Sequence, residues 1–273
     1  MIHKFLESKL YRKTFIFFSS LFKKLFGNDA HSKLSFSHRY LKAKYLKILE
    51  SFGVYLFSNP YYVCFGNNSN YKNIHSIINK RNGRYLEIGA VDGYFESPTY
   101  HLSSQYGWKG ILVDANKKLL QYAKYYRPHD EIIFSACSNF ENAKKNKTIK
   151  FLPLHHSGEI YYSDDKIDPS AKIMKDKLKI EPEEVPLSTL SNIISSSNIL
   201  ENNSLDLIVL DVEGHEIDVL NGINFDILKV SFILVESRTN EEFLITKKFL
   251  ENKDFKLLTQ TSDIDYLYQN NLL

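Results

Sequence analysis

Short apolar runs alternate with segments of helical spacing from residue 81 to the end of the chain. The run 205–212, LDLIVLDV, is apolar almost throughout, as expected for a strand in the buried middle of a parallel sheet. Strands that alternate with helices predict an α/β fold with a doubly wound, mostly parallel seven-stranded sheet. The predicted strands are 84–88, 110–114, 131–135, 205–212, 231–236, 255–259 and 266–268.

The same pattern predicts the domain organisation. Residues 1–80 are expected to form a helical N-terminal extension, and residues 81–273 the α/β domain. A strand at 149–154 begins an insertion, about 151–184, that is expected to face the substrate, because long insertions at a ligand edge often decide substrate choice. Helices are predicted at 74–79, 96–105, 116–126, 188–197, 213–221 and 241–252.

The composition excludes several classes of protein. The 273-residue chain is 43% hydrophobic and 25% charged, which is typical of a globular protein and not of collagen, a disulfide scaffold or a disordered chain. A net charge of +3 provides no general basic field, so nucleic-acid binding is not expected. The two cysteines, Cys64 and Cys137, lack metal-ligand spacing and favour a reducing compartment, the cytoplasm.

The N-terminal segment departs from this even balance of charge. Residues 1–27 carry six Lys or Arg and one Glu, interleaved with Leu and Phe at helical spacing. The uncharged stretch 14–22 is too short to cross a bilayer, which needs about 20 apolar residues. Two interpretations stay open: a helix that lies on the anionic inner face of the membrane, or a helix packed against the protein or a partner.

A glycine-containing loop follows the first predicted strand. Gly89 and Gly93 allow a tight turn and the close approach of a ligand. The middle glycine of the dinucleotide-binding motif G-x-G-x-x-G is absent, and the acids Glu87 and Asp92 would repel a phosphate. The loop therefore favours a cationic group on the ligand, such as an amine or a sulfonium.

Two further strand ends carry acids at the edge where parallel sheets bind ligands. Asp114, after the second strand, is suited to accept hydrogen bonds from ribose hydroxyls, or alternatively to cap the next helix. Asp211, Glu213 and His215 crowd the end of a later strand. Acids in a first helical turn also favour the helix dipole, but the clustering favours a functional site. Glu236 is a weaker candidate.

Residues 84–268 resemble the FkbM-type methyltransferases, which use S-adenosylmethionine. The resemblance implies a Rossmann-like class I methyltransferase fold; one departure is Pro98, where the family pattern has Asn. The matching segments are YLEIGAVDGYFESPTYHLS (85–103), GWKGILVDANKKLL (107–120), VPLSTL (185–190), LDLIVLDVEGHEIDVLNGINF (205–225) and FILVES (232–237).

The resemblance also implies roles for individual residues. The methionine end of the cofactor would lie at 87–93, the ribose at Asp114 and the adenine near 135–137. The cofactor-binding residues would be Glu87, Gly89, Ala90, Asp92, Gly93, Asp114, Ala115, Ser135, Ala136 and Cys137. The residues facing the reacting centre would be Asp211, Glu213 and His215.

The family typically methylates hydroxyl groups, so the resemblance implies O-methylation of a sugar, a glycan-type acceptor or another secondary product. An alcohol is a poor nucleophile, and His215, with an ordinary pKa of about 6.5, is the natural general base. Glu213 could orient it or act instead. A divalent cation on Asp211 and Glu213 is an alternative, although no metal set is predicted. The rival classes are a nicotinamide-dependent oxidoreductase and a non-catalytic, membrane-recruited binding protein.

Overall fold

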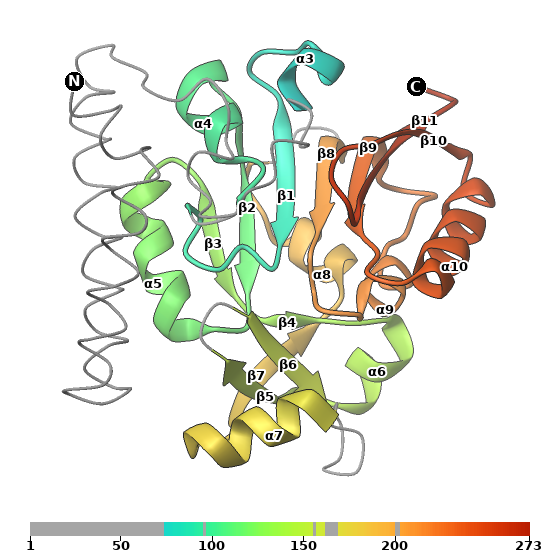
Figure 1. Cartoon of the computed structure of the whole chain (residues 1–273). Helices are drawn as coiled ribbons and strands as arrows, with labels where there is room; N and C mark the ends of the chain where they lie inside the picture. The colour runs from blue at the N-terminus through green and yellow to red at the C-terminus, as the bar shows by residue number, and fades with distance from the viewer. Residues whose placement is uncertain (1–73, 95–96, 155–156, 162–168, 200–202) are drawn as a thin grey trace, which may run out of the picture. The chain divides into compact units, whose positions relative to one another are not determined.

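The computed structural model describes residues 74–273, except 95–96, 155–156, 162–168 and 200–202 (Figure 1). These residues all belong to one compact unit, Asn59–Leu273. The basic segment 1–27, with its two open interpretations, lies outside the described residues. None of the helices in the described part is long and apolar enough to cross a membrane.

The main sheet has seven strands in the spatial order β10-β11-β9-β8-β1-β2-β3. Its strands are parallel except β11, which runs antiparallel to both of its neighbours. The predicted seven-stranded, mostly parallel sheet is thus confirmed. Its strands are β1 (Arg84–Ile88), β2 (Lys109–Asp114), β3 (Glu131–Phe134), β8 (Ser204–Leu210), β9 (Lys229–Glu236), β10 (Phe255–Gln260) and β11 (Asp265–Asn270).

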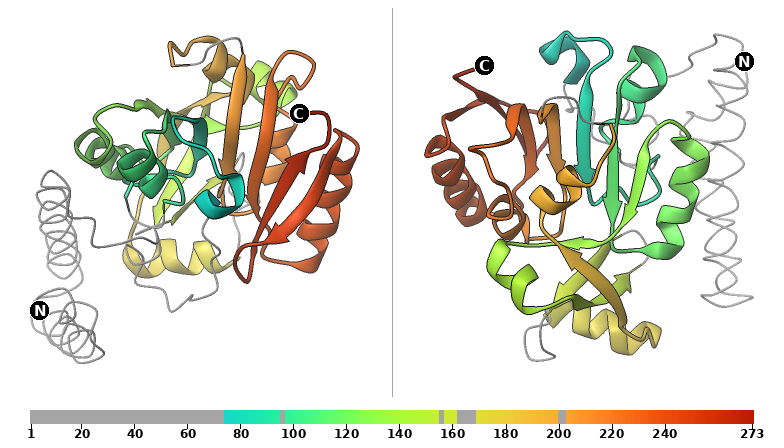
Figure 2. Two further views of the ribbon diagram at one scale, coloured as in Figure 1. Left: turned by 90° about the horizontal axis from the view of Figure 1, so that it is seen from above. Right: turned by 180° about the vertical axis from the view of Figure 1, so that it is seen from behind.

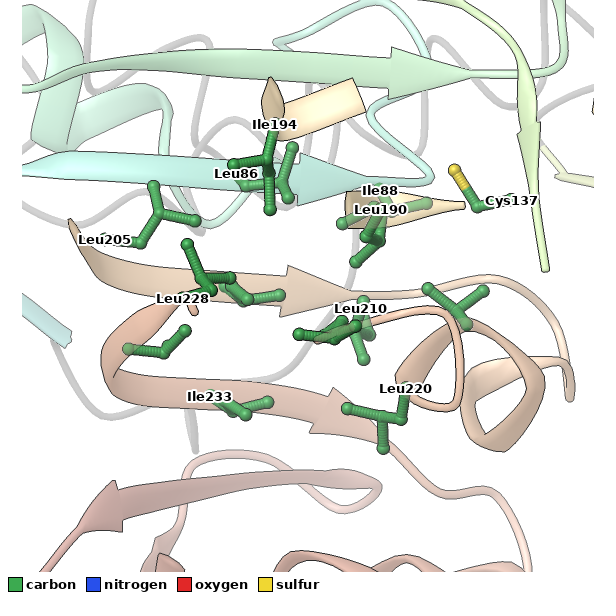
Figure 3. Close-up of a cluster of buried hydrophobic side chains, with 14 of the residues drawn as sticks. Leu86, Ile88, Cys137, Leu190, Ile194, Leu205, Leu210, Leu220, Leu228 and Ile233 are labelled. Atoms are coloured by element: carbon green, nitrogen blue, oxygen red, sulfur yellow. The ribbon is translucent and has the colours of Figure 1, made fainter. Parts of the chain in front are cut away.

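The apolar runs are explained by burial of this sheet on both faces. Leu86 pairs with Ile208, which pairs with Ile233, and all three belong to one buried cluster. Leu86 and Ile233 are labelled in Figure 3. The neighbouring residues Tyr85 and Leu207 are also paired, but they belong to a second cluster. Because successive side chains alternate between faces, a strand covered on both sides must be apolar at nearly every position.

Helices supply the two layers that bury the sheet (Figure 2). Side chains from α8, α9 and α10 join the first cluster, and those from α3, α4 and α5 join the second. Both layers therefore leave the carboxyl ends of β1, β2 and β8 for a ligand. The helices are α3 (Ile74–Ile78), α4 (Tyr100–Tyr106), α5 (Lys117–Tyr126), α8 (Leu190–Ser195), α9 (Glu216–Leu220) and α10 (Asn240–Glu251).

A second sheet lies beyond the carboxyl ends of β1 and β2 (Figure 1). Its strand order is β4-β7-β5-β6. Its elements extend from 136 to 188 and include the predicted insertion, about 151–184; of its strands, only β5 was expected from the sequence. The elements of this region are β4 (Ala136–Cys137), α6 (Phe140–Lys145), β5 (Thr148–Leu154), β6 (Ser157–Tyr161), α7 (Pro169–Leu178) and β7 (Glu183–Ser188).

Candidate active site

A cavity lies between the two sheets, at the carboxyl ends of β1, β2, β3 and β8. It contains about 920 Å³ of space, part of it open solvent. This is the ligand edge expected for an open parallel sheet. The cavity is lined by Ile88, Gly89, Val91, Asp114, Ala115, Asn116, Leu119, Ser135, Ala136, Cys137, Phe151, Gly158, Ile160, Asp211, Val212 and Glu213.

The structure brings most of the predicted site residues to this cavity but not all. Those that line it are Gly89, Asp114, Ala115, Ser135, Ala136, Cys137, Asp211 and Glu213. Those absent from its lining are Glu87, Ala90, Asp92, Gly93 and His215.

Glu87 lies behind the glycine loop in a buried polar network. Its Oε2 accepts hydrogen bonds from Ser97 Oγ at 2.9 Å and from Thr99 Oγ1. Burial raises the pKa of Glu87, and the Arg127 guanidinium opposes that shift. The same guanidinium donates to the Gly93 carbonyl oxygen at 2.9 Å. Glu87 therefore supports the loop and does not line the cavity, and its predicted contact with the methionine end of the cofactor stays a prediction.

The second half of the loop also turns away from the cavity. The Asp92 side chain is buried, and its Oδ1 accepts the Tyr94 N–H at 2.9 Å. The Ala90 N–H donates to the Val113 carbonyl oxygen at 3.2 Å, which ties the loop to β2. Ala90, Asp92 and Gly93 therefore lie outside the cavity lining, and their predicted contacts with a ligand stay predictions.

Gly89 joins the loop to the end of β8. The Asp211 N–H donates to the Ile88 carbonyl oxygen at 3.1 Å, which brings the two strand ends together. A Cβ atom at Gly89 would lie 1.7 Å from the Asp211 carbonyl oxygen, and the backbone there has a φ of +81°. Only glycine meets both conditions. The position is therefore fixed by the approach of Asp211 to the loop.

Val91 has an unusual backbone conformation within the same loop. Its φ is 52°, in the left-handed region that a β-branched residue rarely adopts. Its N–H donates to Asp114 Oδ2 at 2.7 Å, and it lines the cavity. Strained residues of this kind often lie at functional sites. Sequence reasoning missed Val91, although its two glycine neighbours were identified.

Asp114 ends β2 with its carboxylate at the cavity. In addition to Val91, the Asn116 N–H donates to this carboxylate, at 2.6 Å. Burial raises the pKa of Asp114 to about 7, against the effect of these two hydrogen bonds. The cap of α5 is Asn116, whose side chain accepts the Leu119 N–H at 3.1 Å. The alternative that Asp114 serves as the helix cap is therefore wrong.

The end of β8 carries a group of facing carboxylates. Glu213 is paired with Arg238, with 2.6 Å between Oε2 and Nη1. Surrounding protein, followed by the charges of Glu236 and Glu213, raises the pKa of Asp211 well above its ordinary range. Because Asp211 is exposed to the cavity, water there relieves the desolvation, and the neighbouring charges are the firmer cause. Asp211 is thus a cavity-lining group with a raised affinity for a proton, and Glu236, at the end of β9, has a raised pKa as well.

The remaining residues of the 211–216 block have structural contacts. Glu216 is buried, and its Oε1 accepts the N–H groups of Val212 and Gly214 at 3.1 and 3.2 Å. His215 is the N-cap residue of α9, and its Nδ1 lies 3.9 Å from Asp218 Oδ2. Glu216 and His215 therefore have contacts typical of the N-terminus of a helix. Asp211 and Glu213, in contrast, line the cavity.

Three residues of the second sheet line the cavity: Phe151, Gly158 and Ile160. The sequence did not predict that these residues belong to the site. Their strands follow one another too closely to be recognised as part of a βαβ pattern. Val91, Asn116 and Val212 could have been found as direct neighbours of the predicted residues. Within the described part of the chain, no group of three or more His, Cys, Asp or Glu side chains is arranged to hold a metal ion.

Comparisons with known proteins give one family. The family model described as the methyltransferase FkbM domain matches residues 87–257. The search of curated proteins gave no significant match.

Solved structures of methyltransferases are also similar to the chain. The methyltransferase FkbM from Methylobacillus flagellatus KT has 11% identity and a TM-score of 0.42, over 69% of this chain and 43% of that chain. A TehB-like S-adenosylmethionine-dependent methyltransferase from Corynebacterium glutamicum has 14% identity and a TM-score of 0.38, over 86% and 99%. Aeropyrum pernix fibrillarin, solved with natively bound S-adenosylmethionine, has 13% identity and a TM-score of 0.37, over 70% and 66%. This chain thus spans less than half the length of the Methylobacillus chain.

Proposed function

This chain belongs to the FkbM methyltransferase family, whose cofactor is S-adenosylmethionine, and we propose that it methylates a hydroxyl oxygen of a sugar, a glycan-type acceptor or a related product. One observation carries the proposal. The cavity has a hydrogen-bonded carboxylate, Asp114, at the end of β2 and a second carboxylate, Asp211, at the end of β8. These strands lie on either side of β1, so a ligand that passes the glycine loop can reach both.

The residues present fit the cofactor. Each oxygen of Asp114 accepts one N–H and keeps a second lone pair, so the carboxylate can still accept hydrogen bonds from ribose hydroxyls. The acids Asp211 and Glu213 suit a sulfonium group, whose positive charge S-adenosylhomocysteine does not carry. Among the described residues that line the cavity, none is Lys, Arg or His. A nicotinamide dinucleotide would therefore place its phosphates beside acids, with no lining cation to bind them.

The chain's own residues would act on the acceptor. When bound, the cofactor supplies an electrophilic methyl group. Asp211, whose pKa is raised well above its ordinary range, is suited to take the proton of the acceptor hydroxyl as the new bond forms. Arg238 holds Glu213 beside it, so Glu213 is suited to orient the hydroxyl. His215 lies outside the cavity lining, and the structure therefore favours Asp211 over His215 as the base.

A cofactor-release assay tests this function. The full chain is incubated with S-adenosylmethionine and a panel of sugars, nucleotide-linked sugars and lipid-linked sugars, and S-adenosylhomocysteine is quantified. Release that requires a hydroxylated acceptor supports O-methylation, and mass spectrometry of the product locates the methyl group. Release that occurs only with amine acceptors would contradict the proposed acceptor class and leave the family unchanged.

The basic segment 1–27 carries a separate proposal, peripheral contact with an anionic membrane. Attraction of about 1 kcal/mol for each basic residue near such a surface is sufficient for reversible binding. The full chain should co-sediment with vesicles that contain phosphatidylserine but not with neutral vesicles. Replacement of Lys4, Lys9 and Lys13 by Glu should abolish sedimentation. Sedimentation that is equal with both vesicle types would contradict the electrostatic proposal.

A further inference from the structure

Three residues of the second sheet line one side of the cavity: Phe151 on β5, and Gly158 and Ile160 on β6. Phe151 and Ile160 are direct partners in the antiparallel ladder. Gly158 lies two residues before Ile160 on the same strand, so these two positions share one face of the sheet. The three residues therefore form one continuous surface, which we call the hairpin wall.

The hairpin wall is located at the Asp114 end of the cavity. Phe151 and Ile160 belong to a buried cluster with Ala136, which follows β3, and Ala115 packs against the same cluster. Ala115 is the residue after Asp114, whereas Asp211 and Glu213 follow β8, on the other side of β1. The apolar surface thus lies beside the carboxylate suited to a ribose and away from the acids suited to the reacting group.

Gly158 explains how the Phe151 ring can take this position. A Cβ atom at Gly158 would lie 2.1 Å from Cε2 and Cζ of Phe151, well inside van der Waals contact. The ring therefore lies across β6, over a position that only glycine leaves open. Because the clashing atoms are the tip of a side chain, an alanine at 158 would displace the ring without breaking the ladder.

We infer that the hairpin wall is the surface against which the adenine ring of S-adenosylmethionine packs. An aromatic ring and a branched aliphatic side chain present a flat apolar face, which suits a planar base attached to a ribose. The inference rests on the proposed placement of the ribose at Asp114. It also changes the expected role of the insertion, since at least these residues would recognise the cofactor rather than the acceptor.

Calorimetry with S-adenosylhomocysteine and with adenosine tests the inference on the full chain. Phe151→Ala should weaken the binding of both ligands by about tenfold and by the same factor, because the lost contact is with the base that they share. Gly158→Ala should weaken both in the same sense, while Phe151→Leu should retain part of the affinity. Leu187→Ala is the matched control, because Leu187 belongs to the same buried cluster but does not line the cavity. It should lower the melting temperature and leave both dissociation constants unchanged.

Three results would overturn the inference. If Phe151→Leu and Gly158→Ala bind S-adenosylhomocysteine as the wild type does while KM for the acceptor rises, the hairpin wall serves the acceptor. If Leu187→Ala weakens binding as much as Phe151→Ala, the effect is general loosening of the second sheet. If the wild-type chain binds neither ligand, the proposed function itself fails, whereas binding by the wild type with no loss in the hairpin-wall variants is a failure of this inference alone.

Discussion

Asp114 and Asp211 occupy equivalent positions in the sheet, since each follows or ends a strand beside β1, yet their surroundings differ. Asp114 is 8% exposed and accepts two backbone N–H groups. Asp211 is open to the cavity, and the carboxylates of Glu236 and Glu213 face it. Both have raised pKa values. A carboxylate fixed by donors is suited to hold hydroxyls in place, whereas one crowded by like charges is suited to accept a proton.

The largest effect expected from this comparison is on the Asp211 end. Asp211→Asn keeps the size of the side chain but removes its basicity, so kcat should fall by about 10²–10⁴. The dissociation constant for S-adenosylhomocysteine should stay within about twofold, because the lost interaction is made only as the acceptor reacts. Steady-state kinetics and calorimetry on the same preparation measure the two quantities.

His215→Ala and Asp226→Asn are the matched variants for this experiment. His215 lies outside the cavity lining, and Asp226 is exposed after α9. Both variants should keep kcat within about twofold. A larger loss of kcat in His215→Ala than in Asp211→Asn would return the general base to His215 and remove the contrast between the two strand ends.

At the end of β2, Asp114→Ala should act on the binding of the cofactor. The variant loses the acceptor for the ribose hydroxyls and also leaves the N–H groups of Val91 and Asn116 without their carboxylate. Loss of charge-assisted hydrogen bonds should weaken cofactor binding by about 1.5–3 kcal/mol. Calorimetry measures this change, with kcat at saturating cofactor as the companion value. Unchanged affinity would exclude Asp114 from the cofactor site.

The comparison also shows what the sequence could predict. The strand ends carrying Asp114 and Asp211 were predictable because buried parallel strands contain a long apolar run, so the acid that directly follows the run marks the ligand edge. β7 was not recognised because it contains two glutamates and Pro186, with only Val185 and Leu187 buried in its middle. A half-exposed strand with so few apolar residues resembles a loop.

Individual roles were harder to predict than positions. Glu87 ends up behind the loop because Ser97, Thr99 and Arg127 surround it, and Arg127 comes 40 residues later in the chain. No local pattern shows whether an acid near a strand end faces the cavity or a buried arginine. The same applies to the hairpin wall, which depends on the pairing of β5 with β6.

Glu236→Gln should change how the stability and the activity of the protein depend on pH, because it removes one of the charges beside Asp211. Burial, followed by the charge of Glu213, raises the pKa of Glu236 to about 8, and the side chain is 12% exposed. Because the folded-state pKa is raised, the folded protein binds this proton more tightly than the unfolded chain does. The resulting stability is present in full below the ordinary pKa and is lost as the pH rises through about 8.

The Glu236→Gln variant should therefore be more stable than the wild type at pH 9, by about 1–2 kcal/mol, and similar to it near pH 4. Removing this charge should also lower the pKa of Asp211, so the acid limb of the kcat/KM profile should move to lower pH. The charge of Glu213 still acts on Asp211 in the variant, so the elevation of the Asp211 pKa should be reduced and not abolished. Denaturant unfolding at several pH values measures the change in stability. If the free energy of unfolding depends on pH in the variant as it does in the wild type, Glu236 is not the cause of that dependence.

The smallest effect is expected at Val91, whose N–H binds the Asp114 carboxylate. A left-handed conformation costs an L-residue about 1–2 kcal/mol, and glycine removes that cost while adding about 0.4–1 kcal/mol of unfolded-state entropy. Val91→Gly should therefore stabilise the chain by about 0.5–1 kcal/mol in denaturant unfolding. Binding of S-adenosylhomocysteine should weaken by about two- to threefold, because the loop that presents the N–H to Asp114 is less ordered before binding.

Asn203, with a φ of 50°, is the matched control, since asparagine tolerates this conformation. Asn203→Gly should not raise the free energy of unfolding and should leave the binding of S-adenosylhomocysteine unchanged. If Val91→Gly instead destabilises the chain, the loop stores no strain at Val91, and the geometry of the Asp114 end has another source.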